Sequence, residues 1–315
     1  MKLLFIIDPP ESLKAYKDST VAMMRAAQKR GHEVHIGEPH ALRWHGRVSI
    51  GAHPIALTDD DDDWYRLQAA RTTELAAFDA VVMRKDPPFD LEYMTSTWLL
   101  SQAERDGARV FNRPTAVRDH NEKLGILEFS RFVAPTLTSR EPEAVQTFID
   151  EHRDVILKRL DGMGGESIFR VRHDDPNRNV IVEHMTQQGA RSTMAQRYLP
   201  AIADGDKRVL LIDGQPVPYC LARLPKLGES RANLAAGGRG EARPLTARDR
   251  EIGEALGPVL AARGLLLVGL DVIGENLTEV NVTSPTCFRE IQDQAGFDVS
   301  GMFIDALERH ARRAA

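Results

Sequence analysis

The most constraining feature of the sequence is a pair of apolar stretches within residues 265–290, joined by Gly274-Glu275-Asn276. Short apolar runs on either side of a glycine-containing loop predict a β-hairpin. With a three-residue loop, Asp271 is expected to face Glu279, and period-two alternation returns Asn281 to the same face. Two opposed carboxylates in apolar surroundings repel each other, so this hairpin needs a positive charge between them.

Two sources of positive charge are possible, and this stretch alone leaves both open. The two carboxylates and the Asn281 side-chain carbonyl are hard oxygen ligands of the kind that Mg²⁺ takes from a protein, with waters and phosphates completing its shell. Alternatively, the carboxylates are solvated or paired with arginine, and Arg289 follows closely in the sequence. The hairpin therefore predicts either a metal site or an ordinary ion pair.

The composition describes an ordinary globular protein. The chain has 315 residues, 42% hydrophobic and 28% charged, with a net charge of −5, and its length favours about two domains. The mild acidity gives no reason to expect nucleic acid or an anionic membrane as partner. Because no signal peptide or membrane span is visible and only two cysteines are present, a cytoplasmic protein is expected.

The N-terminal part reads as a small doubly wound α/β domain. Helices are expected at 91–105 and from an Asp18 or Ser19 N-cap to Gly31, and strands are expected at 3–7, 33–36, 78–83 and 109–111. Residues 37–63 are expected to form a loop that ends in a solvated run of five aspartates.

A stiff basic loop follows the strand at 78–83. Arg84, Lys85 and Asp86 precede two prolines, at the strand end where open α/β sheets bind ligands. An ordinary surface turn would look similar, but rigidity beside clustered cations favours an anion-binding loop.

A glycine-rich loop lies in the middle of the chain. Asp119 is expected to cap a helix that carries residues 121–123, and strands at 155–158 and 167–171 flank the stretch 160–166. This strand–loop–strand order differs from a P-loop, but the loop can bring backbone N–H groups to phosphates, with Lys158 at its edge. Further elements are expected as strands at 135–138 and 193–199, helices at 142–152, 247–262 and 299–312, and a hairpin at 209–221.

A long segment, 224–244, is rich in Gly, Ala and Arg and has almost no large apolar residue. A loop this long in a compact domain is usually functional or disordered. We expect residues 225–243 to act as a mobile lid over an anionic ligand.

Together these signals describe a nucleoside triphosphate held with Mg²⁺. In seven stretches the chain resembles the ATP-grasp superfamily and, within it, the bacterial glutathione synthetases. The stretches are MRKDPPFD (83–90), NEKL (121–124), ILKRLDGMGGESIFR (156–170), AQRYLPAIADGDKRVL (195–210), PVPYCLAR (216–223), NLAAGGRGE (233–241) and VGLDVIGENLTEVNVTSPTCFRE (268–290). They lie between residues 83 and 290 and follow one another in the family's order. Arg159 and Thr20 depart from it, where proline and serine are usual.

The resemblance implies an α/β fold: an ATP-grasp unit preceded by a doubly wound domain. The implied domains are a substrate-binding domain at 1–121, a central subdomain with a glycine flap at 122–192, and a C-terminal subdomain with the metal hairpin and lid at 193–315. It also implies a homotetramer.

The resemblance further implies roles for individual residues. The implied ATP contacts are Lys123, Lys158, Gly162, Met163, Gly164, Gly165, Gln196, Tyr198, Leu199, Asp206 and Arg208. The implied Mg²⁺ ligands, with Mn²⁺ as an alternative ion, are Asp271, Glu279 and Asn281. The implied catalytic residues are Arg208, Arg223, Arg231, Asn233 and Gly238. The implied substrate contacts are Asp18, Ser19, Arg84, Lys85, Asp86, Ser284, Pro285 and Thr286.

The implied reaction is the ATP-dependent ligation of γ-L-glutamyl-L-cysteine with glycine through an acyl phosphate. One alternative is another ATP-grasp carboxylate–amine ligase, which should differ in the stretches MRKDPPFD and NLAAGGRGE. A second alternative is an ATP-binding module without ligase activity, which loss of a phosphate lysine or metal ligand would favour. All of these residues are present, so the ligase is preferred.

Overall fold

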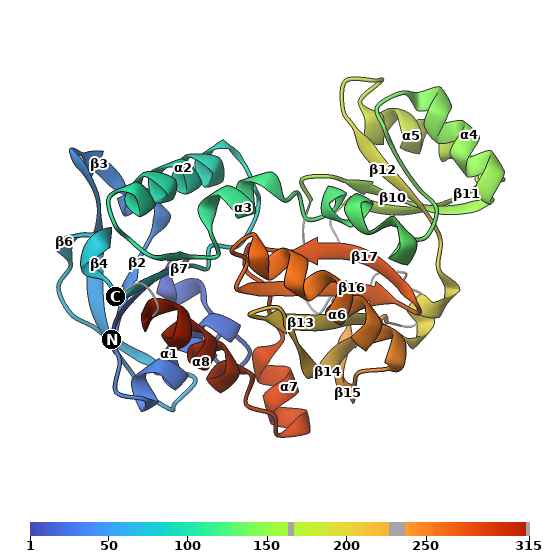
Figure 1. The fold of residues 1–315 in the computed structure, drawn as a ribbon. Helices are drawn as coiled ribbons and strands as arrows, with labels where there is room; N and C mark the ends of the chain where they lie inside the picture. Colours follow the sequence, from blue (N-terminus) through green and yellow to red (C-terminus); the bar gives the residue numbers. More distant parts are fainter. Residues whose placement is uncertain (163–166, 227–236, 313–315) are drawn as a thin grey trace.

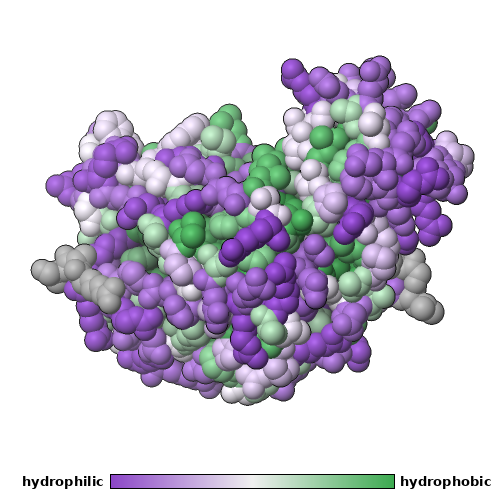
Figure 2. Space-filling view, turned by 45° about the vertical axis from the view of Figure 1, so that its right-hand side comes forward, coloured by the Kyte–Doolittle hydropathy of each residue, from purple (hydrophilic) through white to green (hydrophobic). Residues whose placement is uncertain are grey.

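The computed structural model describes residues 1–162, 167–226 and 237–312 and arranges them around three β-sheets (Figure 1). The chain first builds an eight-stranded sheet, then a four-stranded sheet that stands out as a lobe, then a five-stranded sheet beside the first. In the view of Figure 2 the surface is mostly hydrophilic, with hydrophobic patches where the lobe meets the body. No helix in the described ranges is both long and apolar enough to cross a membrane.

The first sheet has a parallel centre, ordered β2-β1-β7-β8. Its strands are β1 (Lys2–Ile6), β2 (Glu33–Gly37), β3 (Arg43–His45), β4 (Arg47–Leu57), β5 (Tyr65–Leu67), β6 (Arg71–Glu74), β7 (Ala80–Met83) and β8 (Val110–Phe111). Its helices are α1 (Ser19–Lys29), α2 (Leu91–Arg105) and α3 (Pro114–Asp119). The expected α/β class is confirmed.

The loop predicted at 37–63 is wrong, because β3 and β4 occupy most of it. Val48, Ile50 and Ala52 point into the core at every second position, the period of a strand with one buried face. Interleaved Gly51 and Pro54 hide this period in the sequence, since both residues are typical of turns.

The four-stranded sheet is antiparallel and carries its own small core. It contains β9 (Thr136–Ser139), β10 (Asp154–Arg159), β11 (Ile168–Arg172) and β12 (Thr193–Arg197), with helices α4 (Pro142–His152) and α5 (Arg178–Thr186) packed on it. Its buried residues, such as Ile149, Leu157 and Val182, form a cluster separate from the rest of the molecule. Two other clusters extend across both the first and third sheets. The lobe therefore has a core of its own, although Met194 of β12 belongs to one of the clusters of the body.

The five-stranded sheet is antiparallel, ordered β15-β14-β13-β16-β17. Its strands are β13 (Asp206–Ile212), β14 (Gln215–Leu224), β15 (Arg239–Pro244), β16 (Leu267–Ile273) and β17 (Asn276–Asn281), and its helices are α6 (Ala247–Ala262), α7 (Phe288–Ala295) and α8 (Val299–Arg312). α8 returns to pack on α1 of the first sheet. Short 3-10 helices occupy Pro10–Ser12, Pro39–Ala41, Leu75–Ala77, Leu124–Phe132 and Pro200–Asp204.

The β16–β17 hairpin confirms that Asp271 faces Glu279, but its turn and register differ from the predicted ones. Its turn is shorter than predicted, because Ile273 pairs with Asn276. A bulge at Thr278 then restores the register, so Asp271 faces Glu279. The two carboxylates are therefore opposed, as the sequence predicts.

α6 approaches the β13–β14 turn so closely that only a glycine fits at the contact. A Cβ at Gly257 would lie 2.0 Å from the Gly214 carbonyl oxygen. Alanine normally stabilises a helix relative to glycine. We nevertheless expect Gly257→Ala to lower the free energy of unfolding by roughly 1–3 kcal/mol through overpacking, as measured by urea denaturation.

Gly253→Ala is the matched control for this prediction. A Cβ there meets the Pro216 side chain at 3.1 Å rather than a backbone oxygen, so the loss should be smaller. A Gly257→Ala protein as stable as the wild type would contradict the packing described for α6.

Candidate active site

A cavity of about 620 Å³ lies where the first sheet, the third sheet and the loop after β10 meet. It brings together most of the predicted site residues that the structure describes, namely Asp18, Lys85, Asp86, Lys123, Gly162, Arg208, Arg223, Asp271, Glu279, Asn281, Ser284, Pro285 and Thr286. It also has polar lining residues that the sequence did not reveal as site residues, including Asp8, Ser12, Lys14, Lys17, Glu122, Thr283, Cys287 and Glu290.

Cross-strand pairing places two arginines against Asp271. Arg208 on β13 lies opposite Asp271 on β16, and its Nε donates to the carboxylate at 2.5 Å. Arg223 on β14 lies 2.9 Å from the same carboxylate and donates to Asp206 at 2.6 Å. Asp206 and Arg208 are two residues apart on β13, so they share one face of the sheet. The result is a buried cluster of two carboxylates and two guanidinium groups.

The two carboxyl groups of this cluster titrate differently. Burial alone would raise the pKa of Asp271, but Arg208 and Arg223 outweigh burial and hold that pKa below its usual range. Burial dominates at Asp206 and raises its pKa to about 6 despite Arg223. Its Oδ1 is buried and has no hydrogen-bond partner in the described part of the chain. Asp206 is therefore the carboxyl group of this cluster whose cost of burial is not fully offset by its partners.

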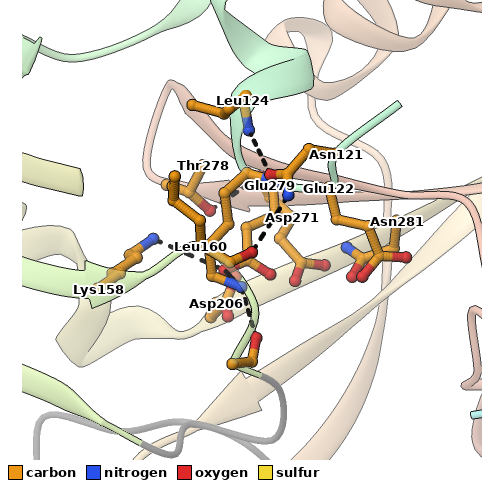
Figure 3. A network of polar contacts seen from close by, with 12 residues as sticks. Asn121, Glu122, Leu124, Lys158, Leu160, Asp206, Asp271, Thr278, Glu279 and Asn281 are labelled. Carbon is orange, nitrogen blue, oxygen red and sulfur yellow. Dashed lines mark hydrogen bonds and ion pairs between the residues drawn. The ribbon is translucent and has the colours of Figure 1, made fainter. Parts of the chain in front are cut away.

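Two lysines converge on Glu279 from outside the five-stranded sheet. Lys158 on β10 of the lobe and Lys123 each lie 3.8 Å from the Glu279 carboxylate. Both are largely buried, and Lys123 also donates to the Gly162 carbonyl at 2.6 Å. Figure 3 shows Asp271, Glu279 and Asn281 close together, with Lys158 approaching from the neighbouring sheet. Positive charge therefore surrounds the opposed carboxylates of the hairpin.

The alternative that Arg289 pairs with the carboxylates of the hairpin is wrong. Arg289 lies near Asp61 and Asp293, at 3.5 Å and 3.8 Å, and not near the hairpin. Within the described ranges, no group of three or more His, Cys, Asp or Glu residues is arranged to hold a metal ion. The predicted ligand set contains only two carboxylates besides Asn281, so the metal site stays a prediction.

Glu122 fixes the end of β17 that leads into residues 284–286, which are predicted to contact the substrate. Its Oε1 accepts hydrogen bonds from Val282 N, Thr283 N and Thr283 Oγ1, at 2.9, 3.1 and 2.8 Å. Burial raises the pKa of Glu122 although these bonds oppose it. The helix predicted here from Asp119 is wrong, because Asp119 ends α3 and Asn121 accepts from the backbone of Lys123 and Leu124 instead.

The predicted substrate residues meet across the boundary between the first and third sheets. Arg84 donates to Thr20 Oγ1 at 3.1 Å and to the Pro285 carbonyl at 2.9 Å. Ser284 donates to Asp86. Asp18 caps α1, and Ser19 Oγ accepts from Phe288 N at 3.2 Å. The N-terminal loops and the segment after β17 therefore form one wall.

Other predicted residues lie elsewhere. Gln196 donates to Thr136 Oγ1 at 3.1 Å, and the Tyr198 ring lies 3.6 Å from the guanidinium carbon of Arg170. Outside the lining of the cavity lie these two residues and Ser19, Arg84, Lys158, Leu199, Asp206 and Gly238. The residues outside the described part of the chain are Met163, Gly164, Gly165, Arg231 and Asn233.

The predicted lid is wrong in part. Residues 239–244 form β15, which pairs with β14 as an edge strand of the third sheet. Arginine, glycine and glutamate in this stretch give no strand signal, so its pairing is decided by the neighbouring strand. Residues 227–236 of the predicted lid lie outside the described residues.

Solved structures define the class of fold. D-cycloserine synthetase DcsG superposes with a TM-score of 0.70 at 16% identity, covering 98% of this chain and 99% of that chain. The ATP-grasp ligase PsnB, complexed with a minimal precursor, Mg and ADP, gives a TM-score of 0.63 at 19% identity, covering 98% of both chains. At these identities the likeness shows the fold alone, and that fold is ATP-grasp.

Sequence relatives then show the family. A model of the prokaryotic glutathione synthetase N-terminal domain matches residues 1–118, and a model of the prokaryotic glutathione synthetase ATP-grasp domain matches residues 122–296. A glutathione synthetase of Ralstonia nicotianae is 58% identical over 100% of this chain and 97% of that protein, and one of Nitrosomonas europaea is 56% identical over 99% of both. The chain belongs to the prokaryotic glutathione synthetase family and is an ATP-dependent ligase.

The role of Glu122 can be tested by two substitutions. Glu122→Ala leaves three donors without an acceptor, so we expect the free energy of unfolding to fall by about 1–3 kcal/mol. Glu122→Gln keeps an oxygen for these donors and should lose less. Urea denaturation measures both, and equal losses would contradict the role assigned to the carboxylate oxygen.

The raised pKa of Asp206 predicts a pH-dependent stability in the metal-free, nucleotide-free protein. A folded-state pKa of about 6 exceeds the unfolded value near 4, so the folded state binds the proton more tightly. The stabilisation is then full below about pH 4 and is lost as the pH rises through about 6. Relative to Asp206→Asn, we expect the wild type to lose roughly 1–3 kcal/mol of unfolding free energy between pH 4 and 7.

Urea denaturation of both proteins at a series of pH values in EDTA measures this difference. Because all other titrating groups are shared, the comparison isolates Asp206. A difference that stays constant or has the opposite sign would contradict the uncompensated burial of this carboxyl group.

Proposed function

We propose that the chain ligates γ-L-glutamyl-L-cysteine with glycine at the expense of ATP, through an acyl phosphate, to give glutathione, ADP and phosphate. The convergence of Lys123 and Lys158 on Glu279, in the cavity that also contains residues 284–286, carries this proposal. Relatives named glutathione synthetase that match the whole chain support the choice of substrates.

The two lysines are proposed to bind the phosphates of ATP. Phosphoryl transfer places negative charge on the equatorial oxygens, and positioned cations stabilise that charge most effectively where water is excluded. Lys123 and Lys158 are 6% and 8% exposed, and they come from different parts of the fold. A nucleotide between them would therefore link the lobe to the body.

The residues of the hairpin fit a magnesium ion. Asp271, Glu279 and Asn281 offer only oxygen ligands on one face, and the unpartnered Oδ1 of Asp206 lies in the adjoining buried cluster. When bound there, Mg²⁺, or Mn²⁺ in its place, would neutralise phosphate charge and polarise the transferring phosphoryl group. The chain's own task is to hold these oxygens in place, which the arginines of β13 and β14 do for Asp271.

Arg208 and Arg223 are proposed to serve the acyl phosphate. Both line the cavity that also contains the hairpin carboxylates and residues 284–286, so they share it with the proposed nucleotide and substrate sites. Phosphorylation of a carboxylate gives it a good leaving group and removes the charge that repels an amine. The arginines would orient the anionic intermediate for attack by glycine.

Exclusion of water is proposed to depend on the lobe. An acyl phosphate hydrolyses readily, so the site has to close before the intermediate forms. The lobe has a core of its own, and its Lys158 lies 3.8 Å from Glu279 of the cavity lining, so it can move as one body when its lysine binds the nucleotide.

The proposed assembly is a cytoplasmic homotetramer that binds small-molecule substrates, with no nucleic acid or membrane partner. Leu91, Trp44 and Trp98 are strongly exposed on the first domain, and subunit contacts would cover such apolar side chains.

An assay of ADP release with Mg·ATP tests the proposed reaction, leaving out each substrate in turn. Release should require γ-glutamylcysteine and rise sharply when glycine is added. If ADP is released only with other carboxylates or amines, the proposed substrates are refuted, but the ligase chemistry is retained. ATP binding without release under any combination would indicate an ATP-binding module without ligase activity.

Glu279→Gln tests the proposed metal and phosphate site. We expect it to lower kcat at least about 100-fold, since a positioned charge at the transferring group contributes a few kcal/mol to the transition state, while the melting temperature changes little. The control is Glu275→Gln, which alters an exposed carboxylate in the turn of the same hairpin. Near-normal turnover of Glu279→Gln at saturating Mg²⁺ would refute the assignment.

A further inference from the structure

A second cavity, of about 480 Å³, lies between α1, α7 and the start of α8, and shares no lining residue with the candidate active site. These three helices pack on one another on one side of the body (Figure 1). Its lining carries charges of both signs, including Arg25 and Lys29 from α1, Arg289 and Asp293 from α7, and Asp59. A cavity this polar has to be filled by water or by a polar ligand.

Three hydrogen-bond donors of this lining have no partner in the described part of the chain. They are Arg25 Nε, Arg289 Nε and Ser300 Oγ. Arg25 is 8% exposed and Ser300 is 2% exposed, and the carboxylate of Asp293 is too far from Arg289 Nε, at 3.8 Å, for a hydrogen bond. A buried donor without an acceptor costs about 1–3 kcal/mol. Three such donors, one from each helix, indicate a missing acceptor.

The rest of each guanidinium group is already held in place. Arg25 donates to Asp61 at 2.7 Å and to the Asp60 carbonyl at 2.9 Å, and Arg289 donates to the other Asp61 oxygen at 3.5 Å. The prediction that the aspartate run is merely solvated is therefore wrong for Asp61. Because Asp61 holds both arginines, binding a further acceptor requires little reordering of their side chains.

We propose that this cavity binds a small molecule that carries both a carboxylate and an ammonium group, of the size of a free amino acid. The carboxylate accepts from Arg25, Arg289 and Ser300, while Asp298 of the same lining already accepts from Gly301 N in the first turn of α8. The ammonium group lies toward Asp59 and Asp293. These two carboxylates repel a purely anionic ligand, so the mixed charge of the lining selects a zwitterion.

The position of this cavity connects it to the candidate active site. α1 is capped by Asp18, and α7 begins directly after Cys287; both of these residues line the first cavity. Ser19 and Phe288, the first residues of the two helices, are hydrogen-bonded to each other. A ligand that bridges Arg25 and Arg289 contacts α1 less than two turns from that bond and α7 at the residue that follows it.

Isothermal titration calorimetry of the full chain, saturated with Mg·ADP and γ-glutamylcysteine, tests the proposal. The probes are L-alanine, propionate, which has the same skeleton without the ammonium group, and inorganic phosphate. We expect the wild-type protein to bind L-alanine at one site. Ser300→Ala and Arg25→Met should each lower the affinity for L-alanine at least tenfold. Propionate and phosphate should bind at least tenfold more weakly than L-alanine.

The variants locate the binding, because neither residue lines the active-site cavity. Ser300→Ala removes a single hydroxyl, so it keeps the test decisive if Arg25→Met fails to fold. Arg178→Met is the matched control, since it removes an arginine paired with Asp150 on the remote lobe, and it should bind L-alanine normally. Three results would each overturn the proposal. The first is no binding of L-alanine, which would mean that water alone fills the cavity. The others are equal binding of propionate or phosphate, and unchanged affinity for L-alanine in Ser300→Ala.

Discussion

The opposed carboxylates of Asp271 and Glu279 impose the constraint on which the rest of the site depends. Charges removed from water cost several kcal/mol each unless they are paired with good geometry. The structure pairs Asp271 with two arginines of its own sheet, and Glu279 with Lys123 and with Lys158 of the lobe. The acidic hairpin is therefore paired with cations from two other strands of its sheet, from Lys123 and from the lobe.

The first and third sheets share their hydrophobic cores, whereas the lobe has its own. This difference explains how the site residues can be held in fixed positions while the site stays open to ligands. The first and third sheets share two apolar clusters, and hydrogen bonds from Arg84 to Pro285 and from Ser284 to Asp86 join their loops into one wall. The lobe packs around a cluster of its own. A wall formed by the loops of two sheets thus faces a lobe that carries Lys158, an arrangement suited to the proposed site that opens for nucleotide and closes for chemistry.

Local patterns predicted those features that local residues decide. Helix limits at 91–105, 142–152, 247–262 and 299–312 agree with the structure, because caps and prolines mark them. The facing of Asp271 and Glu279 was predicted from a three-residue loop, and it holds because the bulge at Thr278 offsets the shorter turn. Arg208 and Glu122 could not be placed from sequence alone, because their partners lie 63 and about 160 residues away and only tertiary strand pairing brings them together. The roles of the site residues stay predictions.

The central claim is that the hairpin carboxylates act through a divalent cation on the phosphates of ATP. Calorimetric titration of the wild-type protein with ATP, in Mg²⁺ and in EDTA, tests it most directly. Without a cation, Asp271 and Glu279 face the phosphates with like charge, so ATP should bind at least tenfold more weakly in EDTA. Equal affinity in both solutions would show that the lysines and arginines hold the nucleotide unaided, and would contradict the claim.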